Sequence, residues 1–281
     1  MEKYDLAVVY RIYPGVSKVP IIHPNNKFEL SKVAVKSFKE SLGDMKVKLW
    51  VLLDNCSEEY ENLFKDIFSN YDVEYLNFPG VGNYKTFNKQ LDILIDQKYS
   101  DTVYVAEDDY IFLPNALKEA VHFINSSNER DSIDFLTIYD SLDFYNMKFH
   151  DYKSTIKCYK NRHWRSISST TLSFMTKRDT LKNTKKVFDS YSRKKNFDSS
   201  LWMSLTKINL FQFSSIFRFI KNNDRDFVRI AKAWIYCWKQ IIFGKKYSLW
   251  SPVPSLGTHL DNQGISPIID WKKTIERDGR S

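Results

Sequence analysis

Glycine and proline are scarce in this 281-residue chain, with 8 of each, which excludes linker-rich and disordered classes of protein. Its three cysteines, Cys56, Cys158 and Cys237, are widely separated, which argues against a disulfide framework or a zinc site and fits a reducing cytosol. No apolar run is long enough to span a bilayer, and no signal peptide is expected because a predicted strand begins at Leu6. The sequence therefore predicts a cytoplasmic protein.

Predicted strands alternate with predicted helices through the first half of the chain, at a spacing typical of a doubly wound, mainly parallel sheet flanked by helices. The strands are expected at 6–12, 47–53, 73–78, 102–106 and 134–139, and the helices at 28–42, 58–69, 84–97 and 116–125. Beyond residue 144 the pattern loosens. We expect an α/β protein with a Rossmann-like half at 1–140 and a second half at 141–281, with a helical insertion at about 205–247.

Charge divides the chain in the same way. Residues 1–143 carry 15 Lys and Arg against 24 Asp and Glu, whereas residues 144–281 carry 27 against 10. Such a basic half indicates an anionic partner. Because no nucleic-acid-binding motif accompanies the charge, we expect anionic lipid or a phosphorylated acceptor in place of nucleic acid.

The segment 224–244 is predicted to be a basic amphipathic helix. Its apolar residues follow the i, i+3, i+4, i+7 spacing: Phe227, Ile230, Ala231, Trp234, Ile235, Trp238, Ile241 and Ile242. Its basic residues Arg225, Arg229, Lys232 and Lys239 share another face. A helix of this kind can lie in a membrane interface. The alternative is that its apolar face packs on the core of the protein.

Three consecutive carboxylates, Glu107, Asp108 and Asp109, close the predicted strand 102–106. Adjacent carboxylates repel one another, and a divalent cation is the natural ligand to relieve that repulsion. Ligands of open α/β sheets gather at the carboxyl ends of strands, where these residues are expected. The alternative is a solvated acidic turn.

The loop 79–83 reads Pro-Gly-Val-Gly-Asn and matches neither the dinucleotide fingerprint nor a Walker loop. A diphosphate bound by this chain would then need another source of positive charge. A metal held by the three carboxylates would supply it.

In these motifs and their order the chain resembles glycosyltransferases of the GT-A fold, particularly the family 2-like enzymes that build bacterial surface polysaccharides. In that family an Asp-x-Asp type motif binds Mn²⁺ or Mg²⁺ and the nucleotide diphosphate, and Glu107-Asp108-Asp109 looks like a variant of it. The resemblance implies that Asp109, Glu107 and His259 hold the metal. As a lone histidine, His259 would otherwise be a packed or surface residue.

The resemblance also implies a donor site for a nucleotide sugar. The residues expected to bind the donor are Tyr10, Arg11, Asp54, Gly80, Asn83, Glu107, Asp108 and Arg165. Three of these have an alternative interpretation: Asp54 can accept hydrogen bonds from turn amides, and both Arg11 and Arg165, which stands beside Trp164, can be solvated.

Asp198 is similar to the family's catalytic Asp, which opens a helix downstream of the metal motif. A carboxylate there would deprotonate the acceptor hydroxyl, which implies inversion at the anomeric carbon. Phe197 stands where the family has an acidic residue, and the alternative is that Asp198 is only a helix cap.

The expected function is transfer of a sugar from a nucleotide-diphosphate donor to a glycan or lipid-linked acceptor, in the synthesis of O-antigen, capsule or lipooligosaccharide. The first half would bind the donor and the second the acceptor, at the inner face of the plasma membrane. Two alternatives stay open: a non-catalytic nucleotide- or carbohydrate-binding protein of the same fold, and a sugar-phosphate nucleotidyltransferase.

Overall fold

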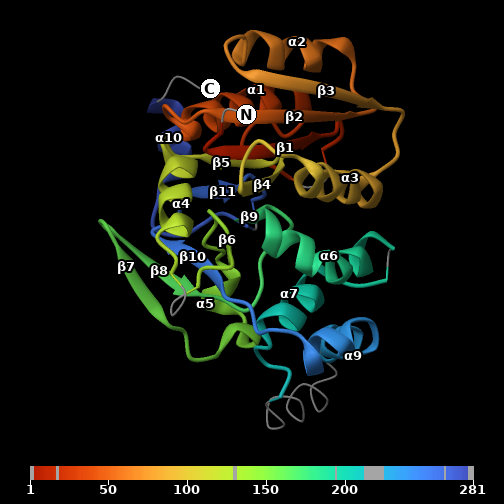
Figure 1. Cartoon of the computed structure of the whole chain (residues 1–281). Coiled ribbons are helices and arrows are strands. Elements are labelled where there is room, and N and C mark those ends of the chain that lie inside the picture. Colours follow the sequence, from red (N-terminus) through yellow and green to blue (C-terminus); the bar gives the residue numbers. More distant parts are fainter. Residues whose placement is uncertain are drawn as a thin grey trace.

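A nine-stranded sheet runs through the computed structural model of the chain, which describes residues 3–16, 19–128, 132–193, 195–211, 225–262 and 264–277 (Figure 1). Its strands in spatial order are β3 (Asp72–Phe78), β2 (Val47–Asp54), β1 (Leu6–Ile12), β4 (Thr102–Glu107), β9 (Phe174–Lys177), β6 (Phe135–Leu136), β10 (Leu249–Val253), β8 (Arg162–Ser166) and β7 (Ile156–Tyr159). Strands of both halves of the sequence therefore belong to one sheet.

The direction of the strands confirms a mixed, mainly parallel sheet. β3, β2, β1 and β4 pair in parallel, β9 is antiparallel to both of its neighbours, β6 and β10 are parallel, and β8 is antiparallel to β10 and β7. Among the described strands of this sheet, only β9 and β8 thus run against the others.

The helices of the first half form where they were predicted, within one or two residues. They are α1 (Lys27–Leu42), α2 (Glu58–Ile67), α3 (Asn83–Asp96) and α4 (Ala116–Asn125). α1 begins at an N-cap in which the Asn26 side chain accepts a hydrogen bond from the Glu29 amide at 3.1 Å. The strand predicted at 134–139 is shorter, because beyond Leu136 the chain leaves the sheet and Tyr139 bridges to Gly257.

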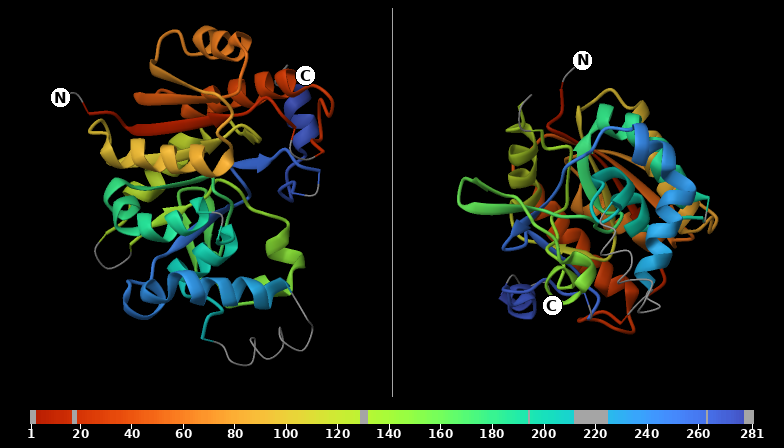
Figure 2. Two further views of the ribbon diagram at one scale, coloured as in Figure 1. Left: turned by 90° about the vertical axis from the view of Figure 1, so that its right-hand side faces the viewer. Right: turned by 90° about the horizontal axis from the view of Figure 1, so that it is seen from below.

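Alternate residues of β1 face two different cores. Leu6, Val8, Tyr10 and Ile12 pack under the layer formed by α1, α2 and α4. Ala7 and Val9 face the other layer, formed by α3 and the second-half helices α6 (Arg178–Ser192) and α7 (Asp198–Thr206). The two layers cover opposite faces of the sheet (Figure 2), so each strand carries apolar residues on both sides.

The remaining elements extend these layers. They are β5 (Tyr110–Phe112), α5 (Asp143–Asn146), a short 3-10 helix η1 (Lys148–His150), α9 (Arg225–Phe243), β11 (Gly257–His259) and α10 (Trp271–Arg277). β11 pairs with β5 beside the main sheet, and α9 packs on α7. The predicted helix at 224–244 is confirmed as α9, whereas the part of the predicted insertion at 212–224 lies outside the described residues. Within the described ranges, none of the helices has the length and apolarity needed to cross a membrane.

Candidate functional site

The three carboxylates lie at the carboxyl end of β4, as predicted. Glu107 ends β4, and Asp108 and Asp109 form the turn that leads into β5. β1 lies between β2 and β4, and the helices that follow β1 and β3 cover opposite faces of the sheet. The strand order reverses at this point, which is where open α/β sheets bind their ligands.

Each carboxylate faces a basic side chain from a different part of the chain. Arg11, at the end of β1, forms an ion pair with Glu107. Lys27, the first residue of α1, lies 2.8 Å from Oδ2 of Asp108. His259 Nε2, at the end of β11, lies 2.9 Å from Oδ2 of Asp109. The alternative interpretation of these carboxylates as a solvated acidic turn is wrong, because all three are mostly buried and each is paired with a basic side chain.

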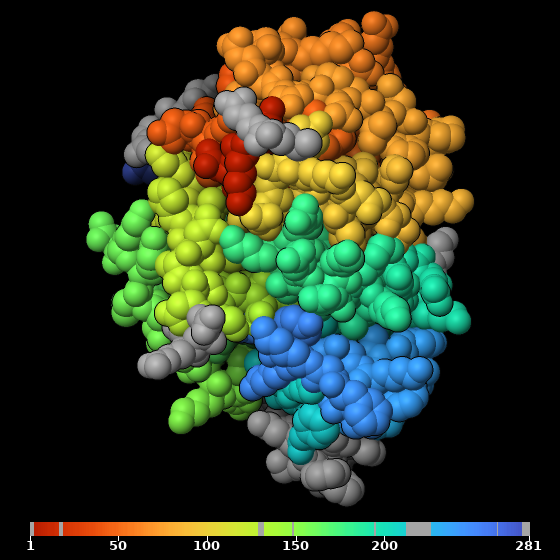
Figure 3. Space-filling view, viewed as in Figure 1, coloured from red at the N-terminus to blue at the C-terminus, as the bar shows by residue number. Residues whose placement is uncertain are grey.

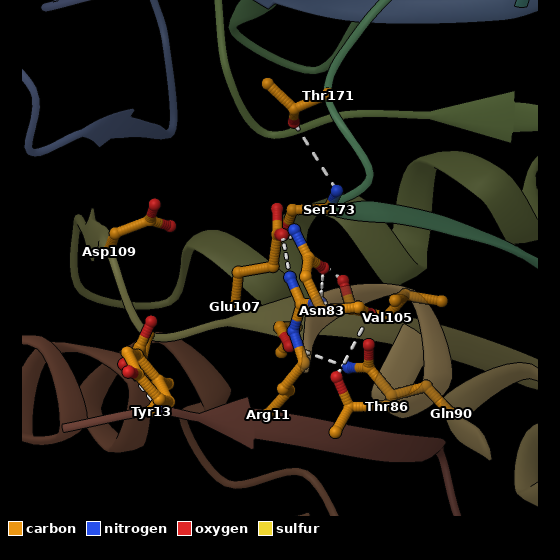
Figure 4. Close-up of polar contacts among 12 residues, drawn as sticks. Arg11, Tyr13, Asn83, Thr86, Gln90, Val105, Glu107, Asp109, Thr171 and Ser173 are labelled. Carbon is orange, nitrogen blue, oxygen red and sulfur yellow. Dashed lines mark hydrogen bonds and ion pairs between the residues drawn. The ribbon is translucent and has the colours of Figure 1, made fainter. Parts of the chain in front are cut away.

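Arg11 connects the first carboxylate to the start of α3. Its guanidinium donates to the carbonyl oxygen of Asn83 at 3.0 Å and also reaches the Asn83 side chain (Figure 4). β1 and β4 place Arg11 directly opposite Glu107 in the parallel register, so the ion pair follows from the sheet itself. Burial raises the pKa of Glu107 to about 7, against the opposing attraction of Arg11.

Asp109 and His259 meet because β11 lies antiparallel to β5, with His259 opposite Tyr110. The ring of His259 also packs on that of Tyr110, with 5.1 Å between centroids. Burial alone would raise the pKa of Asp109, but the charge and hydrogen bond of His259 outweigh it and the pKa lies at about 2. Asp109 is therefore an ionised carboxylate at neutral pH.

Two of the three predicted metal ligands, Asp109 and His259, lie side by side, and Nδ1 of His259 accepts a hydrogen bond from the Asp261 amide at 3.1 Å. Oδ1 of Asp109 is buried and has no hydrogen-bond partner among the described residues. This oxygen could therefore coordinate a cation while Oδ2 faces His259. Glu107 was predicted as the third ligand, but its carboxylate is directed to Arg11. Within the described ranges there is no group of three or more His, Cys, Asp or Glu that could hold a metal. One or two protein ligands still suit Mg²⁺, which takes its others from substrate phosphates and water.

A cavity of about 550 Å³, which we call the donor cavity, opens beside these pairs. Seven of the predicted site residues line it: Arg11, Asp54, Gly80, Asn83, Glu107, Asp108 and Asp109. Residues that the sequence analysis missed complete the lining: Tyr13, Gly15, Lys27, Asn55, Pro79, Gly82 and Thr86. The most important of these is Lys27, because it pairs with Asp108. No sequence pattern distinguishes it from the other lysines of the same helix.

Asp54 organises the loop on the far side of the donor cavity. Its carboxylate accepts hydrogen bonds from the amides of Gly80 and Val81 on Oδ1, at 3.0 and 2.8 Å, and from Gly82 on Oδ2 at 2.8 Å. The three amides converge because Gly80 and Gly82 have φ of 86° and 83°, which L side chains rarely adopt. The alternative reading, Asp54 as an acceptor for turn amides, is thus confirmed, and Asp54 also lines the donor cavity.

Replacing Asp54 with Ala is expected to lower the free energy of unfolding by about 1–3 kcal/mol, because three loop amides lose the buried, charged carboxylate that accepts their hydrogen bonds. Asp54→Asn is the matched control and should lose less, since its carbonyl oxygen still accepts. Urea denaturation measures both variants. If Asp54→Ala were as stable as the wild type, water would satisfy these amides and Asp54 would not be the residue that orders the loop.

Two predicted donor-binding residues lie elsewhere. Tyr10 is wrong as a donor contact, because its ring is fully buried between Phe38 and Phe64, at 5.0 and 5.2 Å, on the face of β1 opposite Arg11. Arg165 does not line the donor cavity either. On β8 it pairs with the buried Asp140 at 2.6 Å, and its charge is satisfied there.

Asp198 lines a second cavity of about 160 Å³, which we call the acceptor-side cavity. Its lining residues are Tyr139, Ser141, Asp143, Phe144, Met147, Phe149, His150, Ser169, Thr170, Thr171, Asp198, Ser199 and Arg229. The cavity adjoins the carboxylates, because Thr171 Oγ1 lies 2.7 Å from the Tyr110 hydroxyl and Tyr139 packs 6.5 Å from the His259 ring.

Asp198 is the first residue of α7, and Phe197 occupies the N-cap. Its Oδ1 accepts a hydrogen bond from the Ser199 amide at 2.6 Å. Burial raises the pKa of Tyr191 on α6 to about 12, and the charges of Asp198 and, more weakly, Glu107 add to the effect. Asp198 lines the acceptor-side cavity and not the donor cavity, and its role as a base stays a prediction.

No family model matches the chain, and no curated protein sequence matches it. Among solved structures, the fold is similar to S. aureus TarS 1-349 in complex with UDP-GlcNAc, at 14% identity, with 66% of this chain and 48% of that chain covered and a TM-score of 0.39. The mannosyltransferase PcManGT from Pyrobaculum calidifontis, in complex with GDP-Man and Mn²⁺, is similar at 12% identity, with 51% and 38% covered and a TM-score of 0.36.

A third similar structure is a cytidylyltransferase from Leptospira borgpetersenii, at 10% identity, with 66% of this chain and 64% of that chain covered and a TM-score of 0.33. The chain spans about half the length of the TarS structure that it matches, with 48% covered. At these TM-scores the likenesses decide nothing about activity. The function rests on the residues of the site.

Proposed function

We propose that this chain is a glycosyltransferase of the GT-A type, which moves a sugar from a nucleotide-diphosphate donor to an acceptor hydroxyl. The observation that carries the proposal is the donor cavity of about 550 Å³, whose lining includes three carboxylates and the basic residues Arg11 and Lys27. A cavity of this volume suits a ligand of the size of a nucleotide sugar. Its position at the strand-order reversal is typical of nucleotide sites.

The charges of the donor cavity support a divalent cation as the partner of the diphosphate. Arg11 and Lys27 are already paired with Glu107 and Asp108, so neither is free to offset a diphosphate alone. Asp109, through its buried Oδ1, would be a ligand of Mn²⁺ or Mg²⁺, and His259, whose Nδ1 accepts from the Asp261 amide and whose Nε2 faces Oδ2 of Asp109, would position that carboxylate. When bound, the cation would act as a Lewis acid that stabilises the departing nucleoside diphosphate.

The protein's own residues would divide the remaining work. The loop ordered by Asp54 would form the wall for the nucleoside, and Arg11, held by Asn83 and Glu107, would keep α3 in place beside it. Asp198, in the acceptor-side cavity, would take the proton of the attacking hydroxyl as general base. A base on the acceptor side implies direct displacement and inversion at the anomeric carbon.

The acceptor is proposed to be a glycan or lipid-linked glycan of a bacterial surface polysaccharide, such as O-antigen, capsule or lipooligosaccharide. Hydroxyl-bearing residues of the acceptor-side cavity, among them Ser141, Ser169 and Thr170, suit a polyhydroxylated ligand. Oγ1 of Thr170 is buried and has no hydrogen-bond partner among the described residues, so it is available to such a ligand. A lipid-linked acceptor would place the enzyme at the cytoplasmic face of the membrane.

Release of nucleoside diphosphate or monophosphate from a panel of sugar nucleotides tests the proposal. We expect UDP, GDP, dTDP or CMP release from one donor with Mn²⁺ or Mg²⁺ present, and loss of that release with EDTA. Binding of a sugar nucleotide without release under any condition would favour a non-catalytic binding protein. Release of pyrophosphate from a nucleoside triphosphate and a sugar 1-phosphate would instead identify a nucleotidyltransferase.

A further inference from the structure

One face of α9 carries exposed apolar side chains along its whole length. We call this the outer face; it consists of Val228, Ile235, Trp238, Ile242 and Phe243. The exposed fraction of these side chains ranges from 45% for Trp238 to 76% for Phe243. Val228 and Ile235 lie before a kink of α9 at Cys237, where φ is −126° and ψ is 18°, and Trp238, Ile242 and Phe243 lie after it. The centroids of the Trp238 and Phe243 rings are 6.3 Å apart.

The opposite face of α9 already supplies the packing that the fold requires. Ile230, Ala233 and Ile241 are at most 3% exposed and pack against Met203 of α7. Cys237 is buried against the core layer under α6 and α7. The alternative raised from the sequence, a helix packed on its own core, is therefore correct for this face. It leaves the outer face unexplained.

Lysines border the outer face. Lys232 lies three residues before Ile235, and Lys239 lies four residues after it, beyond the kink at Cys237. Lys239 lies 5.6 Å from the Trp238 ring centroid, and Lys232 lies 3.7 Å from that of Phe197. The segment 225–246 contains six Lys and Arg against one acidic residue, Asp226, which is buried and paired with Arg229. The border of the outer face is thus positively charged.

The outer face also lies where a large flat partner could reach it. α9 is at the end of the molecule remote from α2 in Figure 1 and in the left view of Figure 2. In the space-filling view it forms part of the surface below α6 (Figure 3). A helix whose apolar side faces outward and whose flanks carry lysines is the pattern of a helix that lies in the plane of a membrane interface.

We propose that the outer face of α9 docks on an anionic lipid bilayer, with Ile235, Trp238 and Ile242 inserted at the headgroup boundary and Lys232 and Lys239 on anionic headgroups. A bilayer accounts for both observations at once, the exposed apolar residues and the basic border without an exposed acid. The docking does not rest on the proposed catalysis, since it needs no donor and no acceptor. It gives the acidic donor half an orientation away from the anionic surface.

Co-sedimentation with phosphatidylcholine vesicles, with and without phosphatidylglycerol, tests the docking. Wild type should pellet with the anionic vesicles at low salt and be released at high salt. The double variant Lys232→Gln/Lys239→Gln should bind about 20- to 30-fold more weakly, since each lysine near an anionic surface contributes about fivefold. Ile235→Ser/Trp238→Ser should lose about tenfold or more while keeping the charge.

The matched control is Val19→Ser/Ile156→Ser, which removes two equally exposed apolar side chains, 67% and 63% exposed, far from α9 in the sequence. It should pellet like wild type, and circular dichroism should show that all variants are folded. Equal pelleting of wild type and both α9 variants, or no pelleting of wild type, would overturn the proposal. A wild-type dimer in light scattering that Ile235→Ser/Trp238→Ser converts to monomer would identify the outer face as a contact between copies instead.

Discussion

Replacing Asp198 with Asn is expected to lower turnover by about 10²–10⁴-fold while donor affinity stays close to that of the wild type. Proton abstraction by a positioned carboxylate is worth a factor of this size, and an amide cannot take the proton. The carboxylate lines the acceptor-side cavity and not the donor cavity, so donor binding should not depend on it. Single-turnover rates at saturating donor, with calorimetry of donor binding, measure the two effects separately.

Asp143 offers a matched control, because it is a second carboxylate in the lining of the same cavity. Asp143→Asn should change turnover by much less than Asp198→Asn. If Asp143→Asn abolished turnover and Asp198→Asn did not, the base would be Asp143. If Asp198→Asn instead lost donor binding and kept normal turnover per bound donor, Asp198 would be a structural residue at the start of α7.

Replacing Asp109 with Ala is expected to weaken metal-dependent nucleotide binding by at least about 100-fold, since even the outer-shell partners of metal ligands are worth about 10–100-fold. Asp109 supplies the buried Oδ1 that has no hydrogen-bond partner among the described residues, and it is the carboxylate that faces His259. Calorimetry of nucleoside diphosphate binding with and without Mn²⁺ measures the loss. Thermal unfolding should show that the fold is retained.

Asp101→Ala is the control for this variant. Asp101 is an exposed carboxylate that precedes β4 at the opposite end of that strand, where it pairs with Lys3. It should bind nucleotide and metal as the wild type does. Full activity of Asp109→Ala with EDTA present would contradict the metal assignment and leave Arg11 and Lys27 as the cations that face the diphosphate.

Local patterns in the sequence were sufficient for the first half of the fold. The strand-helix alternation placed β1 to β4 and α1 to α4, because each is long enough for its periodicity to be unambiguous. The same patterns failed for the strand predicted at 134–139, where β6 retains only Phe135–Leu136. Strands this short are formed by pairing with β9 and β10, which come much later in the chain.

The errors at individual site residues have two different causes. The sequence alone could have excluded Tyr10 as a donor contact. Tyr10 is an even number of residues from Leu6 and Val8 on the same strand, so its side chain points to the same apolar layer as theirs. Lys27 could not have been found, because its role depends on helix α1 beginning beside the turn that carries Asp108. Arg165 was misplaced because its partner, Asp140, lies on another segment whose position no local pattern predicts.

The amphipathic helix at α9 shows what a periodic pattern can and cannot decide. The sequence predicted both an apolar face and a basic border, and it left open whether the apolar face is core or interface. In the structure, the apolar residues occupy more than one side of α9: Ile230 and Ile241 are buried, whereas Ile235 and Ile242 are exposed. A helical pattern marks apolar positions, but only the neighbouring elements determine which of them are covered.

By itself, the sequence determined that three carboxylates stand at the carboxyl end of a buried strand, because strand propensity and the residues that follow a strand are local properties. Only the tertiary structure decided that Arg11, Lys27 and His259 face them, one on each carboxylate. These three side chains come from separate segments that the sheet and the β5–β11 pairing bring to one edge. Contacts between such distant segments depend on how the chain packs, and no local periodicity encodes them.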